Sequence, residues 1–271
     1  MDNFAPSYYK KFKCIADQCH HNCCIGWEID IDDEALEFYK TKPDILSKIS
    51  LDPTPHFVLG EQDRCPFLNQ DNLCELILDH GEQSLCQICS DHPRFRSFFD
   101  MRTEIGLGLT CEAAARLILD NDFVLEKTGE DEEPSEYSAE EEDFFGYRDG
   151  IFSRRPEEFA HLLPEMTVAE LAEVFITLER LDPKWDDVLA ALKNRNESLK
   201  DIKFIRPQHA KRLFDYFVFR HLHETGLEFC VLCTYFVMCL DGDVYETARM
   251  FSSEIEYSDQ NVDSLVERIV E

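Results

Sequence analysis

Clustered cysteines are the feature that most constrains how this chain folds. Nine of the twelve cysteines lie between Cys14 and Cys111. Four of them fall in KCIADQCHHNCCIGWEIDID, residues 13–32, with the spacing Cys-x4-Cys-x3-Cys-Cys. Farther along come Cys-x8-Cys from Cys65, Cys-x2-Cys from Cys86, and then Cys111. Thiols gathered in this way bind metal, form disulfides, carry out redox chemistry or fill the core as small hydrophobic residues.

The N-terminal segment helps to choose among these roles. MDNFAPSYYKKFKC has neither an apolar stretch of signal-peptide length nor a small-residue cleavage site. No apolar run in the chain reaches the roughly 20 residues that a membrane-spanning helix needs. We therefore expect a cytoplasmic protein with no membrane partner. Disulfides are rare in the cytosol, so metal binding becomes the favoured role for the clustered cysteines.

Thiolates are soft ligands that favour zinc and iron–sulfur clusters. A structural zinc ion and a 4Fe-4S cluster each take up to four thiolates, so nine thiols are enough for two such centres. The spacing alone leaves the choice between an iron–sulfur cluster (4Fe-4S) and zinc open. The candidate metal ligands are Cys14, Cys19, Cys23, Cys24, Cys65, Cys74, Cys89 and Cys111, with Cys86 ranked lower.

Local patterns indicate how some of these thiols are presented. The tetrapeptide NQDN lies between two apolar segments in CPFLNQDNLCEL, which predicts a short β-hairpin that brings Cys65 and Cys74 close together. Adjacent side chains such as those of Cys23 and Cys24 point in different directions, so they need not bind one ion together. Cys111 begins a helix with Thr110 as its expected cap, and the dipole at a helix N-terminus favours a thiolate.

The last three cysteines have a different setting. Cys230, Cys233 and Cys239 lie in LEFCVLCTYFVMCLDG, which is apolar on nearly every face. This pattern is typical of a helix in the middle of a bundle. We expect these three thiols to be core residues.

An acidic segment divides the chain. Nine of the fifteen residues of GEDEEPSEYSAEEED, residues 129–143, are acidic, which predicts a solvated linker. The expected organisation is therefore a cysteine-cluster metal-binding region at 1–128, a linker at 129–143 and a helical region at 144–271 that packs on the first. The fold class expected is mainly α: a helical bundle with a small irregular cysteine-rich metal-binding module that contains a short β-hairpin.

Charge excludes some classes of partner. The formal net charge is −29, from 56 acidic and 27 basic residues. A field of this sign repels nucleic acid and anionic lipid, and it attracts cationic surfaces such as those rich in lysine. The same charge also serves solubility without any partner. The sequence has no glycine-lysine phosphate loop, complete dinucleotide fingerprint or serine elbow.

Several segments resemble the flagellin lysine N-methylase family. They are FKCIADQCHHNCCIGWEIDID, CPFLNQDNLCEL, SLCQICSDHPRF and LGLTCEAAARLIL, with DYFVFRHL and MFSSEIEYSDQNVDSLVERI near the end. The resemblance implies a protein-lysine N-methyltransferase that acts on flagellin and uses S-adenosylmethionine. It also implies a cysteine-ligated metal or iron–sulfur centre. By position it assigns the metal to the eight cysteines named above, whereas relatives tend to have serine in place of Cys86.

Two departures from the family leave alternatives open. The middle of this chain looks short for the family, and the Cys-x3-Cys-x2-Cys pattern of radical S-adenosylmethionine enzymes is missing because Gly26 stands at its third position. The first alternative is a non-enzymatic zinc- or iron-binding structural or adaptor protein. The second is an electron-transfer protein with a reversible cluster. No residue identifies itself as the catalytic base or as part of the cofactor site.

Overall fold

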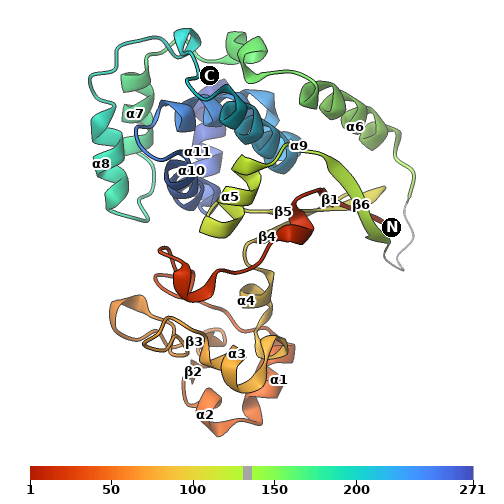
Figure 1. Ribbon diagram of the computed structural model, residues 1–271, viewed down its shortest axis with the longest axis vertical. Helices are drawn as coiled ribbons and strands as arrows, with labels where there is room; N and C mark the ends of the chain where they lie inside the picture. The colour runs from red at the N-terminus through yellow and green to blue at the C-terminus, as the bar shows by residue number, and fades with distance from the viewer. Residues whose placement is uncertain (131–135, 271) are drawn as a thin grey trace. The chain divides into compact units, whose positions relative to one another are not determined.

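The computed structural model describes residues 1–130 and 136–270 (Figure 1), and the chain forms two compact units. Residues Lys13–Phe95 make one unit, here called the cysteine module. Residues Met1–Phe12 and Arg96–Glu271 make the other, here called the body. These boundaries differ from the expected division at residues 128 and 144, because the first strand of the body comes from the N-terminus.

The cysteine module is built from short elements. Tyr39, Phe57 and Phe67 form the aromatic centre of its small core, with ring centroids 5.8 Å and 5.1 Å apart. The sequence offers Asp32 or Asp33 as the cap of the first helix, and Asp32 takes this role by accepting a hydrogen bond from the Ala35 amide at 2.9 Å. The elements are α1 (Asp33–Lys40), α2 (Pro43–Leu46), β2 (Ile49–Ser50), β3 (His56–Phe57), α3 (Glu75–His80) and α4 (Gln87–Asp91).

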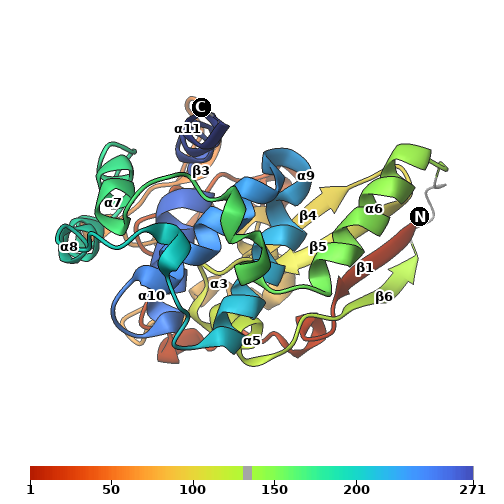
Figure 2. The same ribbon diagram turned by 90° about the horizontal axis from the view of Figure 1, so that it is seen from above.

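A four-stranded sheet, which the sequence patterns did not predict, belongs to the body, except that the first two residues of one strand, Arg94 and Phe95, fall in the module. Its order is β4-β5-β1-β6, with β1 parallel to β5 and antiparallel to β6. The helix α6 (Ala139–Phe152) runs across this sheet (Figure 2), and its buried Arg148 binds Glu104 of β5 at 2.8 Å. The strands are β1 (Asp2–Pro6), β4 (Arg94–Phe98), β5 (Arg102–Leu107) and β6 (Leu125–Glu130).

Helices make up most of the body, so the chain is mainly α, as expected. The rings of Phe175 and Phe236 stack in the core with centroids 3.8 Å apart, and Trp185 and Phe251 pack around them. The helices are α5 (Glu112–Asp120), α6, α7 (Val168–Ile176), α8 (Lys184–Ala191), α9 (Pro207–Cys239), α10 (Val244–Phe251) and α11 (Asp259–Val270), with a 3-10 turn η5 (Pro156–Leu162) and a π-helical turn η7 (Ser252–Glu256).

The longest helix, α9, tests two expectations from the sequence. In the sequence, a proline at the start and a glycine at the end predict a helix from Pro207 to Gly226. The helix does begin at Pro207, and Gly226 breaks its helical geometry with a φ of 86°, although the chain continues as helix to Cys239. Cys230, Cys233 and Cys239 are buried there, which confirms them as core residues. In the described part of the chain, no helix combines the length and the apolar character needed to cross a membrane.

The acidic segment 129–143 is only partly described. Its first two residues, Gly129 and Glu130, belong to β6, and its last five belong to α6, which Ser138 caps by accepting from the Glu141 amide at 3.3 Å. Residues 131–135 of the expected linker lie outside the described residues. Regular structure therefore extends into both ends of this segment.

Candidate metal centre

Backbone pairing brings the first two cysteine-bearing segments of the module together. The Cys65 amide donates to the Cys24 carbonyl at 2.8 Å, and Ile25 and Arg64 form an isolated antiparallel bridge. Gly26 takes a φ of 79°, a left-handed conformation that favours glycine, and its amide donates to the Asp63 carbonyl at 2.9 Å. The alternating residues of GWEIDID predict a short strand, but this segment contributes only an isolated bridge at Asp30.

A tight loop connects Cys65 to Cys74. The Asn69 side chain accepts hydrogen bonds from the amides of Asp71 and Leu73, both at 2.9 Å, which is the turn chemistry that NQDN indicates. Leu68 and Cys74 form a single antiparallel bridge. The expected hairpin is thus reduced to one bridge at this loop, while the regular two-strand ladder of the module lies at β2 and β3.

The third segment supplies Cys86 and Cys89 around the start of α4. Cys86 is fully buried and stands at the N-cap, and its carbonyl accepts from the Ser90 amide at 3.0 Å. Asp32 reaches this turn as well, because its second carboxylate oxygen accepts from the Gln87 amide at 2.6 Å. Side chains three residues apart lie on one side of a helical turn, which places the two thiols together.

Six thiols therefore lie in or beside the small core of the module, and we call them the thiol cluster. Two of them are buried in its core and three pack against that core half-buried, while Cys23 is exposed at the edge. Each of the three segments contributes a pair. The members are Cys23, Cys24, Cys65, Cys74, Cys86 and Cys89.

The first pair shares a proton through a hydrogen bond between its side chains. This bond lowers the pKa of Cys23 to about 7, because the thiolate at Cys23 accepts from its neighbour. The same bond raises the pKa of Cys24, and burial together with the nearby thiols of Cys65 and Cys74 raises it further. One thiolate is therefore favoured at this edge of the cluster, and a second is not.

Burial and hydrogen bonds between thiols also shift the pKa values of Cys86, Cys89 and Cys65. The bond between Cys86 and Cys89 lowers the pKa of Cys86 and raises that of Cys89, on which the thiols of Cys24 and Cys65 also act. Burial raises the pKa of Cys65 to about 11, and Cys74 and Cys86 add to the effect. The thiols thus lie close enough to oppose one another's ionisation, and only a cation among them would favour several thiolates at once.

Three of the nine predicted ligands lie outside this cluster. Cys14 is exposed and accepts a hydrogen bond from the Ala16 amide at 3.4 Å, and Cys19 is half-buried. Cys111 belongs to the body, where it, and not the expected Thr110, stands at the N-cap of α5 without a side-chain capping bond. Across residues 1–130 and 136–270, no three or more His, Cys, Asp or Glu side chains are positioned to hold a metal ion.

The body contains a buried polar network that the sequence patterns did not predict. Glu256 is buried at η7 and accepts from Tyr216 at 3.0 Å and from the ring of His221 at 2.6 Å, with Arg220 at 3.4 Å. Burial raises the pKa of the Glu256 carboxyl, but Arg220 and His221 outweigh burial and lower it to about 2. Tyr216 also accepts from the Leu109 amide at 3.3 Å. The segment DYFVFRHL carries Tyr216, Arg220 and His221, and MFSSEIEYS carries Glu256. In the sequence, the only sign of this network is that charged and aromatic residues stand within otherwise apolar helices.

Comparison with known proteins gives distant relatives over part of the chain. Proteins named Lysine-N-methylase from Salmonella typhimurium (strain LT2) and Salmonella choleraesuis are each 26% identical over 133 residues, which is 43% of this chain and 32% of the relative. The Flagellar biosynthetic protein FliU of Salmonella muenchen is 26% identical over 133 residues, 77% of its length. The match thus spans about a third of the length of the two methylases. No family model matches, and no solved structure is similar.

These relatives bear on the resemblance that the quoted segments indicate. Two of them carry the name of a lysine methylase and the third a flagellar name. The resemblance to flagellar lysine methylases is therefore confirmed at the level of distant sequence similarity.

Proposed function

We propose that this chain acts in the N-methylation of lysine residues of flagellin, as a protein-lysine N-methyltransferase that uses S-adenosylmethionine and a cysteine-ligated metal or iron–sulfur centre. The observation that carries the proposal is the thiol cluster, in which three separate segments each bring a pair of thiols to one place. The names of the relatives support lysine methylation, and the thiol cluster supports the metal centre.

The donor set of the cluster fits a thiophilic metal. Soft sulfur ligands suit zinc and iron–sulfur clusters, and the opposed ionisation of neighbouring thiols is relieved when a cation replaces their protons. The ligands of the centre would come from these six thiols, of which Cys65 and Cys86 are the buried ones. Among the described residues the thiols are not arranged around a single ion position, so metal binding would have to draw them together. When bound, the centre would fix the three segments to one another and supply a coordination site for the cofactor. The ligands outside the cluster, Cys14, Cys19 and Cys111, remain proposals from the resemblance.

Residues of the chain must convert the lysine ammonium into a neutral, reactive amine. A lysine ammonium has a pKa near ~10.4, so the amine must be desolvated or placed beside a base before it attacks a methyl group. The strong negative charge of the chain would attract a lysine-bearing surface of flagellin and speed its encounter. Because the match covers about a third of the methylases, the whole activity is a proposal for this chain.

Metal analysis tests the centre first. Protein purified without oxygen is assayed for iron, zinc and acid-labile sulfide, and its visible spectrum is recorded. Iron and sulfide near ~4 per chain with brown absorbance support a 4Fe-4S enzyme. Zinc at ~1–2 per chain without sulfide favours the structural metal protein. Protein without either metal contradicts the proposed centre.

Methyl transfer tests the activity separately. Purified flagellin is incubated with the metal-loaded chain and S-adenosylmethionine, and each lysine is examined for a mass increase by peptide mass spectrometry. Replacement of Cys65 by serine should abolish both metal and methylation, whereas Cys233→Ser, in the core of the body, should keep both. Metal-loaded protein that leaves flagellin unmodified would overturn the enzymatic function and leave the metal centre standing.

A further inference from the structure

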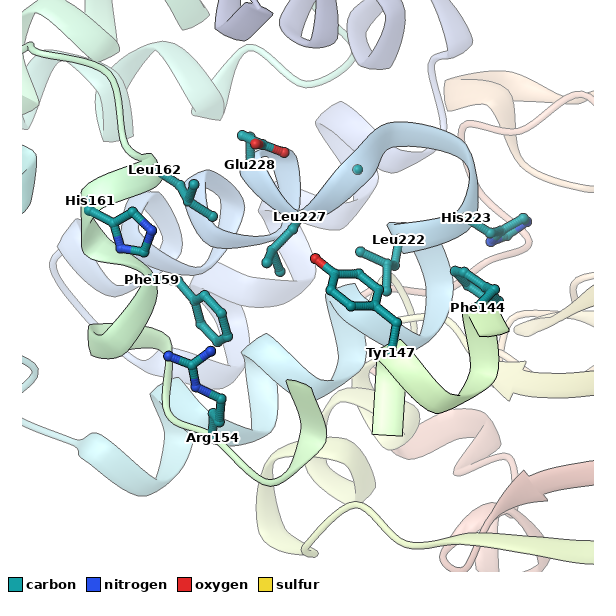
Figure 3. Close-up of a pocket in the computed structure, with 11 residues that line it drawn as sticks. Phe144, Tyr147, Arg154, Phe159, His161, Leu162, Leu222, His223, Leu227 and Glu228 are labelled. Atoms are coloured by element: carbon teal, nitrogen blue, oxygen red, sulfur yellow. The ribbon is translucent and has the colours of Figure 1, made fainter. Parts of the chain in front are cut away.

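A cavity of about 490 Å³ opens in the body at the point where α9 breaks (Figure 3). Gly226 interrupts the helix with φ 86° and ψ 172°, and Leu227 and Glu228 begin the next helical turn. A side chain at position 226 would adopt this conformation only with strain, and its Cβ would come within 3.4 Å of the Glu228 carboxylate. The break therefore shapes the cavity and places one carboxylate at its edge.

Apolar and aromatic side chains form the wall. Phe159 and Leu222 are buried beneath the cavity, and Phe144 is half-buried at its side. Tyr147 stands at the opening, and its hydroxyl points toward Leu227 in Figure 3. The Phe159 ring already has the Arg154 guanidinium 4.3 Å from its centroid, so this wall accommodates a cation over an aromatic face.

The polar part of the lining, besides the Tyr147 hydroxyl, consists of the Arg154 guanidinium, the imidazoles of His161 and His223, and one carboxylate, that of Glu228. Arg154 donates to Glu158 at 3.0 Å, and His223 lies 3.2 Å from Glu224. Arg154 and His223 thus each have a carboxylate partner that does not line the cavity. Among the described residues, no hydrogen bond or ion pair engages the carboxylate of Glu228, which lines the cavity. A ligand that is apolar along its length and positively charged at its end matches this combination.

We propose that this cavity binds the side chain of a lysine residue in a protein substrate, with its methylene groups along the aromatic wall and its ammonium beside Glu228. The proposal rests on the proposed lysine methylation, for which it names a substrate-side site. Tyr147 contributes a π-face that attracts ammonium and methylated ammonium groups alike, whereas Phe159, which already has Arg154 over its ring, adds apolar surface. The volume also leaves room for residues that flank the lysine in a peptide.

Binding of a short peptide tests the site without any methyl transfer. The probe is an N-acetylated, C-amidated tripeptide Gly-Lys-Gly, titrated into the full chain and followed by saturation-transfer NMR, with Gly-norleucine-Gly as the uncharged control. We expect saturable binding of the lysine peptide only. Glu228→Gln should weaken it about fivefold, as expected for loss of one partly exposed ion pair. Tyr147→Ala should weaken it as well.

A matched variant and the activity assay separate the possible failures. Glu173→Gln removes an equal charge from an exposed position of α7 away from the cavity, and it should bind like the unaltered chain. Equal binding by Glu228→Gln and Glu173→Gln, or binding of the norleucine peptide, would overturn the site. Specific lysine binding without methylation of flagellin would remove the enzymatic function but keep the site. Methylation with an unchanged KM in Glu228→Gln would remove the proposed lysine site but keep the enzymatic function.

Discussion

The cysteine module and the body solve the problem of stability in different ways. The body packs large side chains such as Trp185, Phe175 and Phe236 in a core beneath long helices. In the module, the longest helix, α1, has eight residues, the two-stranded ladder has two residues in each strand, and two of the eleven buried core residues are cysteines. Short elements bury too little apolar surface to offset the entropy of ordering the chain, so a small unit of this kind needs cross-links or metal. The difference predicts that the body folds through burial and the module through its thiols.

Removal of the metal should produce the largest difference in stability between the module and the body. Binding at a structural thiolate site contributes roughly 10–16 kcal/mol in small metal-folded domains. Chelation under anaerobic conditions should therefore abolish amide hydrogen-exchange protection in residues 13–95 and leave α9 protected. Mass spectrometry of peptides from both units measures this directly. Unchanged protection of the module after complete metal loss would show that its apolar core is sufficient.

A core truncation should produce the opposite pattern. Phe236→Ala removes one ring of the stacked pair with Phe175, and a fully buried phenylalanine costs about 3–5 kcal/mol on truncation. Chemical denaturation followed by circular dichroism should show the loss in the body, while the metal content of the module stays the same. Ile205→Ala, at a side chain that is 95% exposed, is the control and should change stability by less than ~0.5 kcal/mol.

The body should also show a pH dependence that originates in a buried carboxyl. Burial raises the pKa of Asp215 from 3.8 to about 7, although its ion pair with Lys211 opposes the shift. The unfolded chain loses this proton near pH 3.8 and the native chain near pH 7, so stability falls as the pH rises between these values. The Asp122 carboxyl adds to the shift.

Replacement of Asp215 by asparagine removes this titration. The variant should gain stability relative to the unaltered chain on going from pH 5 to pH 8, by roughly 2–3 kcal/mol, because each pKa unit corresponds to about 1.4 kcal/mol. Thermal unfolding at both pH values measures the difference, and Asp201→Asn, an exposed substitution, should show none. A pH-independent difference between Asp215→Asn and the unaltered chain would show that the group is already ionised in the native state at pH 5.

Removal of a helix cap should give the smallest effects, and one cap in each unit allows the same kind of substitution to be compared in both. Thr167 caps α7 through the Glu170 amide at 3.2 Å, and Asp32 caps α1 in the module. Thr167→Ala should cost about 1 kcal/mol and loosen only the body. Asp32→Ala should loosen only the module, and by more, because Asp32 also accepts from the Gln87 amide beside Cys86. Hydrogen exchange in both units measures this, and equal effects would contradict the extra role of Asp32.

Local patterns in the sequence predicted many separate features correctly. The start of α9 at Pro207, its break at Gly226 and the cap at Asp32 all follow from residue chemistry that acts within a few positions. The same holds for the turn that Asn69 stabilises. The apolar character of α9 was enough to place its cysteines in the core. These features were predictable because neighbouring residues in the chain determine them.

The sheet and the composition of the thiol cluster depended on distant residues. The strand Asp2–Pro6 pairs with Arg102–Leu107 and Leu125–Glu130, and its alternation is too short to identify it in the sequence. The resemblance ranked Cys86 lower and included Cys111, whereas the structure buries Cys86 in the cluster and assigns Cys111 to the body.

The sequence by itself determined that thiols in the first part of this chain are the chemically distinctive groups, and that the remainder is mainly helical. Composition and spacing are sufficient for both conclusions, because soft ligands and helical periodicity are properties of local sequence. Only the tertiary structure decided which thiols meet, since backbone pairing such as that between Cys24 and Cys65 joins segments forty residues apart. The tertiary structure likewise formed the cavity beside Glu228, because its wall combines α6, η5 and the broken helix α9, which no local pattern connects.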